Sequence, residues 1–305
     1  MNNPYTIIEV KPEWRLGQEQ MGSKRKFWYS EATDSPRWLF KYAREIIPQV
    51  LSGEHWAEKI AEQIAEKMEI PHAKVELAVY QGNRGSTTQS FVTKENPLLV
   101  HGNEILCAAD KAYESLKTFK QKQHTLEYIF NFFDKVSVKP DDAEGIKCLF
   151  ASYLILDALI SNVDRHHENW GLLFTVVERQ LMLRLAPSFD HASSLGRELT
   201  DVRRQQILGD GHIGQYVKKG HGAIFFGETG KKAPSPLALI QNALVSYPAT
   251  FQNALRCLDG VTERDCETVV DNVPEGWMTS SARQFAKALL RYNLEQLNNL
   301  RSQVS

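Results

Sequence analysis

Apolar positions at helical spacing predict two amphipathic helices. In the first, four large apolar side chains stand four positions apart: Trp56, Ile60, Ile64 and Met68. This helix should end before Pro71. In the second, the spacing i, i+4, i+7 and i+11 joins Leu149, Tyr153, Leu156 and Ile160. This pattern predicts a helix with one apolar face that ends just before Asn162.

Short apolar or aromatic runs predict strands and hairpins. The runs are residues 27–30, 37–42, 74–80, 90–93, 171–177 and 181–185. Polar turns at residues 81–85 and 178–180 join two of these pairs into hairpins. Residues 98–104 are predicted to connect two lobes. Beyond them the pattern is mainly helical in three regions, which are residues 104–136, the residues before Asn162, and much of 236–302.

Together these elements predict an α+β fold with two lobes. Residues 1–103 would form a small, β-rich N-lobe with one helix, and residues 104–305 a larger, mainly helical C-lobe. With 305 residues, of which 42% are hydrophobic and 24% charged, the chain is long enough to bury a large core.

Composition narrows the class of protein. The formal net charge is −1, so no overall field favours direct binding of nucleic acid or of an anionic membrane. No apolar stretch approaches the roughly 20 residues of a bilayer span. The four cysteines show no C-x-x-C spacing, and the N-terminus lacks the pattern of a signal peptide. These features predict a cytoplasmic protein with reduced thiols.

The run of residues 162–169, Asn-Val-Asp-Arg-His-His-Glu-Asn, carries the candidate chemistry. Asp164 and Asn169 stand five positions apart, which is the separation between the base and a metal ligand in a kinase catalytic loop. Asp190 follows the predicted 171–185 hairpin and supplies a second hard oxygen ligand for Mg²⁺. His166 could reach the phosphate being transferred. Asp157, one helical turn before the loop, is predicted to be a buried brace that bonds the loop backbone or Arg165.

Two other interpretations of this region stay open on the residues alone. His166, His167, Asp190 and His191 could hold a transition metal, as in a metal-dependent phosphohydrolase. A kinase-like fold could also bind nucleotide without turnover and act as a regulator.

The motif N-x-D-R-H-x-x-N, an apolar hairpin and then A-P-x-[FY]-D resembles the HipA-like kinases, bacterial Ser/Thr kinases often found as toxins. Residues 21–26, Met-Gly-Ser-Lys-Arg-Lys, resemble the phosphate loop of that family, and residues 38–41, Trp-Leu-Phe-Lys, resemble its strand with the ATP-binding lysine. The chain departs from the family pattern at Lys24, where glutamine is usual. The resemblance implies a protein-kinase-like and phosphoinositide-kinase-like fold, as a stand-alone kinase domain without the N-terminal subdomain of longer relatives.

The resemblance also implies a set of nucleotide-binding residues. The phosphates would bind Gly22, Ser23, Lys24, Lys26 and Lys41. Glu58 would hold Lys41 in place, with Glu54 as the competitor one turn earlier. Adenine would stack near Val100, His101 and Gly102.

The implied activity is transfer of the ATP γ-phosphate, with Mg²⁺, to a Ser or Thr hydroxyl of a protein. Asp164, His166 and Lys41 would be the catalytic residues, with Asn169 and Asp190 as the metal ligands. The acceptor could be a translation component, the protein itself, a small molecule or a lipid, and toxins of this type have antitoxin partners. Autophosphorylation could occur at Ser23 or in residues 190–204, and the sequence does not select the position.

Overall fold

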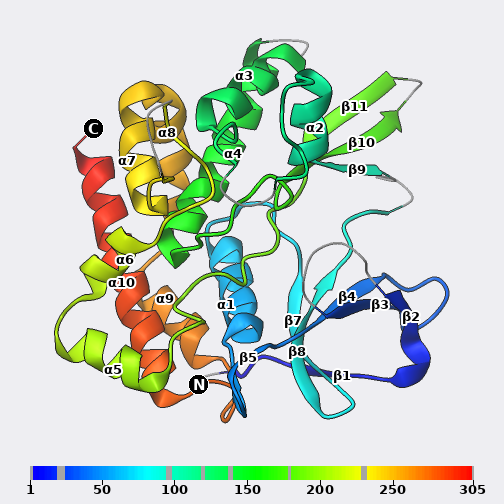
Figure 1. Cartoon of the computed structure of the whole chain (residues 1–305), viewed down its shortest axis with the longest axis vertical. Coiled ribbons are helices and arrows are strands. Elements are labelled where there is room, and N and C mark those ends of the chain that lie inside the picture. The colour runs from blue at the N-terminus through cyan, green and yellow to red at the C-terminus, as the bar shows by residue number, and fades with distance from the viewer. Residues whose placement is uncertain are drawn as a thin grey trace.

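The computed structural model describes residues 3–18, 25–93, 98–117, 121–136, 140–177, 180–227 and 232–303. A β-rich part and a helical part lie on either side of helix α1 (Figure 1). Within the described residues, no helix is both long enough and apolar enough to cross a bilayer. The four cysteines carry free thiols.

A six-stranded sheet forms the β-rich part, in the order β1-β7-β8-β4-β3-β2. Its strands are β1 (Ile7–Val10), β2 (Arg15–Gln18), β3 (Lys26–Tyr29), β4 (Trp38–Tyr42), β7 (Val75–Tyr80) and β8 (Asn83–Gln89), with the 3-10 turn η1 (Pro12–Trp14) between the first two. β1 and β7 are parallel, and the other neighbours are antiparallel. Alternate side chains of β3 and β4 are buried together in a small aromatic core that includes Phe27, Tyr29, Phe40 and Tyr80.

The hairpin predicted for residues 74–93 has a different second strand. β8 begins at Asn83 and ends at Gln89, so the prediction of a strand at 90–93 is wrong. The turn contains only Gln81 and Gly82, whose φ angles of 49° and 75° are those of the tight turns that join antiparallel strands. Because β8 is polar, it shows no apolar alternation, yet it lies between β4 and β7 with Thr87 fully buried.

Helix α1 (Glu54–Lys67) follows a small hairpin of β5 (Glu45–Ile47) and β6 (Val50–Leu51). The helix predicted before Pro71 is therefore confirmed. Its residues Trp56, Ile60 and Ile64 are buried in the same large core as the helices of the C-terminal part. The helix thus joins the two parts of the molecule, and the division at residues 103 and 104 stays a prediction.

A second sheet carries the connector and the predicted hairpin. Its order is β11-β10-β9, with β9 (Leu98–His101), β10 (Gly171–Val177) and β11 (Gln180–Leu185). The connector is therefore a strand, paired with β10 through His101 and Gly171, and it continues directly into helix α2 (Gly102–Ala109). The tip of the hairpin at 178–179 lies outside the described residues.

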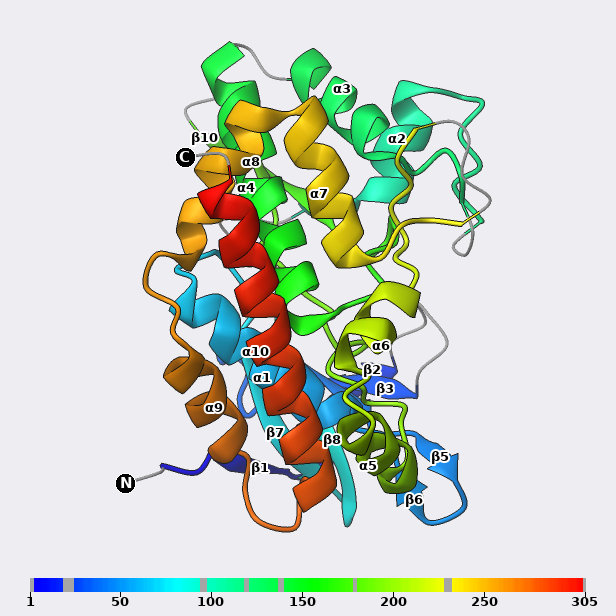
Figure 2. The ribbon, with the colours of Figure 1, turned by 90° about the vertical axis from the view of Figure 1, so that its left-hand side faces the viewer.

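The helical part contains α4 (Pro140–Ile160), the helix predicted before Asn162, together with the remaining helices. They are α3 (Leu126–Val136), α5 (Asp201–Gly209), α6 (Ile213–Lys219), α7 (Pro236–Ser246), α8 (Pro248–Ala254), η2 (Leu255–Leu258), α9 (Glu263–Asp271) and α10 (Ser280–Ser302). The region 104–136, predicted to be mainly helical, contains α2 and α3 as separate helices, because α2 ends at Ala109 and Asp110 is extended. The long α10 lies across the helical part (Figure 2). Its buried Asn293 donates from Nδ2 to the Leu159 carbonyl and to Ser161 Oγ, which fixes the end of α4.

Candidate active site

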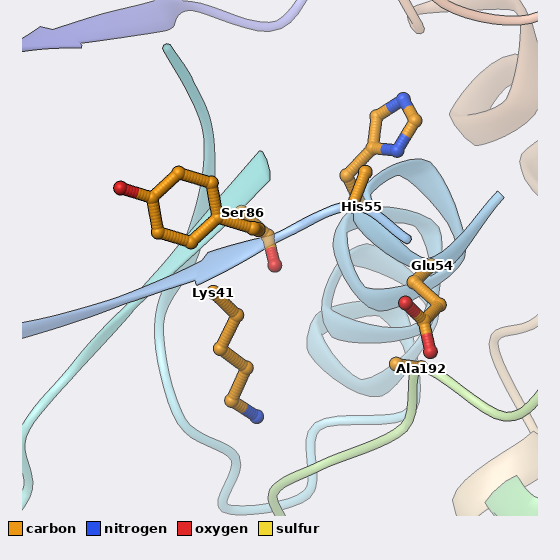
Figure 3. Close-up of a pocket in the computed structure, with 7 residues that line it drawn as sticks. Lys41, Glu54, His55, Ser86 and Ala192 are labelled. Atoms are coloured by element: carbon orange, nitrogen blue, oxygen red, sulfur yellow. The ribbon is translucent and has the colours of Figure 1, made fainter. Parts of the chain in front are cut away.

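Lys41 meets two carboxylates at the junction of the two parts. It comes from β4, and its Nζ lies 3.0 Å from Asp190 Oδ1 and 3.9 Å from Glu58 Oε2. Burial opposes the positive charge of Lys41, but Asp190 and Glu58 more than offset it, and together they raise the pKa of the lysine. The ammonium therefore stays protonated at neutral pH. Figure 3 shows Lys41 extending from its strand beside helix α1, which carries Glu54.

The structure distinguishes the two candidate glutamates on α1. Glu58 is buried beside Lys41, and its Oε1 accepts a 2.8 Å hydrogen bond from the backbone N–H of His191. Burial works to raise the pKa of Glu58, whereas Lys41 and then His191 lower it, and the net direction is down. Glu54 instead forms an ion pair with Arg197, at 2.8 Å from Nη1 to Oε1. Glu58 is thus placed as the partner of the lysine.

The candidate catalytic loop follows the end of α4 at Ile160, and its first residue, Ser161, has a φ of 53°. Asn162 is buried, and its Nδ2 donates to Asp157 Oδ1 at 2.8 Å. Its Oδ1 accepts from the backbone N–H of Asp164 at 3.2 Å. The amide of Asn162 therefore sets the direction in which the chain leaves the helix toward Asp164.

Arg165 binds the parts of the site together. Its guanidinium donates to both oxygens of Asp157, at 2.7 and 2.8 Å, and the predicted brace is confirmed. It also donates to the carbonyls of Asn169 at 2.8 Å and Phe189 at 3.3 Å, and to Ser188 Oγ at 3.0 Å. Burial acts to lower the pKa of Arg165, but the charge and hydrogen bonds of Asp157 outweigh it and raise the pKa. A charged guanidinium thus fixes the candidate catalytic loop to the segment before Asp190.

The same contacts bring the two candidate metal ligands together. Arg165 bonds the backbone at Asn169 and at Phe189, the residue before Asp190. Asn169 uses its Nδ2 to donate to the Asp164 carbonyl at 2.7 Å, so its amide oxygen is the atom that a cation would take. One amide and one carboxylate oxygen, from Asn169 and Asp190, are the hard donors that Mg²⁺ prefers. The residues present therefore fit this ion.

The histidines do not form a metal site, and that alternative is wrong. His167 Nδ1 bonds Tyr113 Oη at 2.8 Å, and His191 Nε2 bonds Ser188 Oγ at 2.7 Å. Burial lowers the pKa of His167 to about 4, so this ring is neutral inside the fold. In the part of the chain that the structure describes, no three side chains of His, Cys, Asp or Glu are grouped to hold a metal.

His166 has a different environment from its neighbour. Its Nε2 lies 4.0 Å from Asp164 Oδ1, and its Nδ1 accepts from the backbone N–H of Glu168 at 3.2 Å. The ring therefore stands next to the candidate base.

The structure describes only some of the other residues that were predicted to contact the nucleotide. Gly22, Ser23 and Lys24 lie outside the described residues. Lys26 is on β3 directly opposite Lys41, so the two side chains share one face of the sheet.

Val100, His101 and Gly102 lie where β9 passes into α2. His101 Nδ1 is 2.9 Å from the carbonyl of Glu168, next to the catalytic loop. A Cβ at Gly102 would come within 2.3 Å of the Trp170 ring, so this close approach requires glycine.

Several contacts of the site were not predicted. Ser193 contacts Asp164, Arg197 contacts Glu54, and Ser188 contacts Arg165. Serine and arginine are common in exposed segments, so only their place in the fold distinguishes these three.

Similarity to known proteins covers most of the chain. The model of the HipA-like C-terminal domain family matches residues 18–228. A stretch of 63 residues is 36% identical to the serine/threonine-protein kinase CtkA of Helicobacter pylori, and it covers 21% of this chain and only 19% of that protein.

Two solved structures share the fold. The crystal structure of the proinflammatory kinase CtkA of Helicobacter pylori has a TM-score of 0.76 at 17% identity, covering 100% of this chain and 98% of that one. HipA of Shewanella oneidensis MR-1, solved with HipB and operator DNA, has a TM-score of 0.59 at 13% identity, covering 96% of this chain and 68% of that one. The predicted α+β, two-lobed kinase-like fold is confirmed.

Proposed function

This chain belongs to the family of the HipA-like C-terminal domain, and on that premise we propose that it is an ATP- and Mg²⁺-dependent kinase acting on a Ser or Thr hydroxyl of a protein. The observation that supports the proposal most strongly is the 3.0 Å contact between Lys41 and Asp190, residues 149 positions apart. A lysine for phosphates and a carboxylate for a metal ion meet there, beside a catalytic loop.

Each charged group has a role in this proposal. Lys41, held by Glu58, binds the α- and β-phosphates of the nucleotide. Asn169 and Asp190 hold Mg²⁺, which neutralises charge on the phosphates when it is bound. The phosphate loop of Gly22, Ser23, Lys24 and Lys26 would cover the phosphates.

The acceptor hydroxyl would meet Asp164. Its carboxylate lies on the loop and is about one-third exposed, so a substrate can reach it. Asp164 would orient the hydroxyl and take its proton as the oxygen attacks the γ-phosphate. His166, 4.0 Å from Asp164, would offset negative charge on the transferring group.

Adenine is assigned to the connector between the two parts. Val100, His101 and Gly102 form the end of β9 and the start of α2, next to the catalytic loop. Backbone groups of a connector in this position can bond the edge of a base.

The biological setting is also part of the proposal. HipA of Shewanella oneidensis is solved together with HipB, so a HipB-like antitoxin is a candidate partner of this chain. We propose a toxin-like kinase of the cytoplasm, whose substrate is a translation component or the chain itself. Co-purification with the product of a neighbouring gene would test the partner.

The function is tested with purified protein, Mg²⁺ and γ-labelled ATP, alone and with cell lysate. Wild-type protein should place label on protein, and Asp164→Asn should lower the rate by at least about 100-fold, the usual contribution of a general base. Asp190→Ala should abolish Mg²⁺-dependent nucleotide binding in calorimetry. The exposed Asp210→Asn serves as the matched control and should change neither.

Three outcomes would contradict the proposal in distinguishable ways. Label only in small molecules or lipids would indicate a kinase of the same fold with another acceptor. Nucleotide binding without transfer would indicate a regulator. Transfer by Asp164→Asn at the wild-type rate would remove Asp164 from the mechanism.

A further inference from the structure

Ser193 lies against the candidate base. Its Oγ donates a 3.2 Å hydrogen bond to Asp164 Oδ2. Two backbone bonds fix this position independently of the side chain, because Val163 N–H donates to the Ser193 carbonyl at 3.2 Å and Leu195 N–H donates to the Ile160 carbonyl at 3.0 Å. Removing the hydroxyl would therefore leave the segment in place.

Arg197 extends this contact to helix α1. Its Nη2 donates to Ser193 Oγ at 3.1 Å, and its Nη1 donates to Glu54 Oε1 at 2.8 Å. Its carbonyl accepts from Gly53 N–H at 2.8 Å, at the start of α1. A continuous polar path thus runs from Asp164 through Ser193 and Arg197 to Glu54, one turn before the residue that holds Lys41.

The other hydroxyls described in this segment have local partners. Ser194 is buried and donates to the His191 carbonyl, and Thr200 accepts from Arg203 N–H as the cap of α5. Ser193 differs because its hydroxyl accepts from a cation and donates to a carboxylate. A hydroxyl polarised in this way is a stronger donor, since successive hydrogen bonds reinforce one another.

We infer that Ser193 and Arg197 are positioning residues that hold the Asp164 carboxylate in the orientation required for proton transfer and join it to the first turn of α1. A carboxylate on a loop has rotational freedom, and a bond to one oxygen fixes the direction of the other. In this chain Ser193 binds Oδ2 of Asp164, and His166 lies on the side of Oδ1. This inference rests on the proposed kinase activity.

The test compares the steady-state kinetics of the full chain and its variants. Ser193→Ala should lower kcat about 10-fold or more, as loss of a hydrogen bond to a charged group does, while KM for ATP stays within about twofold. Ser193→Thr keeps the hydroxyl and should restore kcat to within about threefold of wild type. Ser302→Ala removes an equivalent hydroxyl from the exposed end of α10 and should change neither constant.

Arg197 is tested in the same assay. Arg197→Ala should lower kcat as Ser193→Ala does, and the double variant should be no more than about threefold slower than either single variant, because both act through one contact. Independent, multiplying effects would overturn the shared path. The positioning role would be overturned if Ser193→Ala kept the wild-type kcat, or if Ser193→Thr did not restore the kcat that alanine lost. Phosphate on Ser193 in mass spectra of wild-type protein would also overturn it.

A crystallographic comparison separates this inference from the proposed function. Absence of phosphate transfer by wild-type protein would count against the kinase activity alone. Crystal structures of wild type and Ser193→Ala would then decide the inference: the carboxylate of Asp164 should be bonded to Ser193 in the first and turned or disordered in the second. An identical Asp164 side chain in both structures would overturn it.

Discussion

At the scale of single residues, the buried ion pair of Arg165 and Asp157 holds the parts of the site together. Both side chains are 3% exposed, and their ion pair is bidentate. A buried charge without its partner is costly, because the interior solvates it poorly. The guanidinium also bonds the backbone on both sides of the site, at Asn169 and Phe189. The pair therefore connects the segments that carry the two candidate metal ligands.

We expect Asp157→Ala to lower the free energy of unfolding by about 3–5 kcal/mol, since it leaves Arg165 buried and unpaired. Chemical denaturation followed by circular dichroism would measure this loss. The control is Asp259→Ala, which removes an exposed partner of Arg301 and should cost at most about 1 kcal/mol. Equal losses in the two variants would show that burial does not govern the contribution of the Asp157 pair.

At the scale of elements, the position of Lys41 depends on how closely β4 and β8 approach. Gly85 of β8 pairs with Tyr42 of β4, and a Cβ at Gly85 would lie 2.2 Å from the Lys41 carbonyl. No side chain fits there unless β4 moves. The strand that carries the lysine therefore requires glycine on its neighbour.

We predict that Gly85→Ala lowers the free energy of unfolding by about 1–3 kcal/mol, the usual cost of forcing a group into a packed interior. It should also weaken ATP binding, because the displaced strand carries Lys41. Denaturation and calorimetry would measure the two effects. Gly17→Ala is the matched control, since Gly17 is also in a strand but has no atom within 4 Å of a new Cβ. The prediction fails if both variants bind ATP like wild type.

At the scale of the whole molecule, α1 belongs to both parts. It carries Glu58 to Lys41, yet its apolar residues Trp56, Ile60 and Ile64 pack in one core with α4 and α10. Residues of that core are fully buried on helices far along the chain, such as Phe150 and Leu289. The helical part is therefore incomplete without a helix from the first 70 residues.

A fragment of residues 104–305 should consequently lack a cooperative unfolding transition, whereas the full chain should show one. Loss of α1 exposes a wide apolar face and leaves cavities that the other helices do not fill. Thermal melts followed by near-ultraviolet circular dichroism would test this. A sharp transition in the fragment would show that the helical part folds alone and would support two independent domains.

The sequence alone determined the features that depend on neighbouring positions. The helices α1 and α4, the order of Asp164, Asn169 and Asp190, and the hairpin before Asp190 all follow from local spacing, because the pitch of a helix and the pleat of a strand are set by backbone geometry. The strands β1 and β2 were missed because they are short and partly polar, and β8 was misplaced because its burial comes from its neighbours.

Only the tertiary structure decided which charged groups meet. The resemblance favoured Glu58 as the partner of Lys41 and left Glu54 as its competitor, and the packing of α1 against the sheet places Glu58 at Lys41 and Glu54 at Arg197. The bonds of Arg165 and of Ser193 likewise join segments that the sequence separates. Such contacts depend on how whole elements pack, and burial then makes each pairing strong, because the interior screens charge far less than water does.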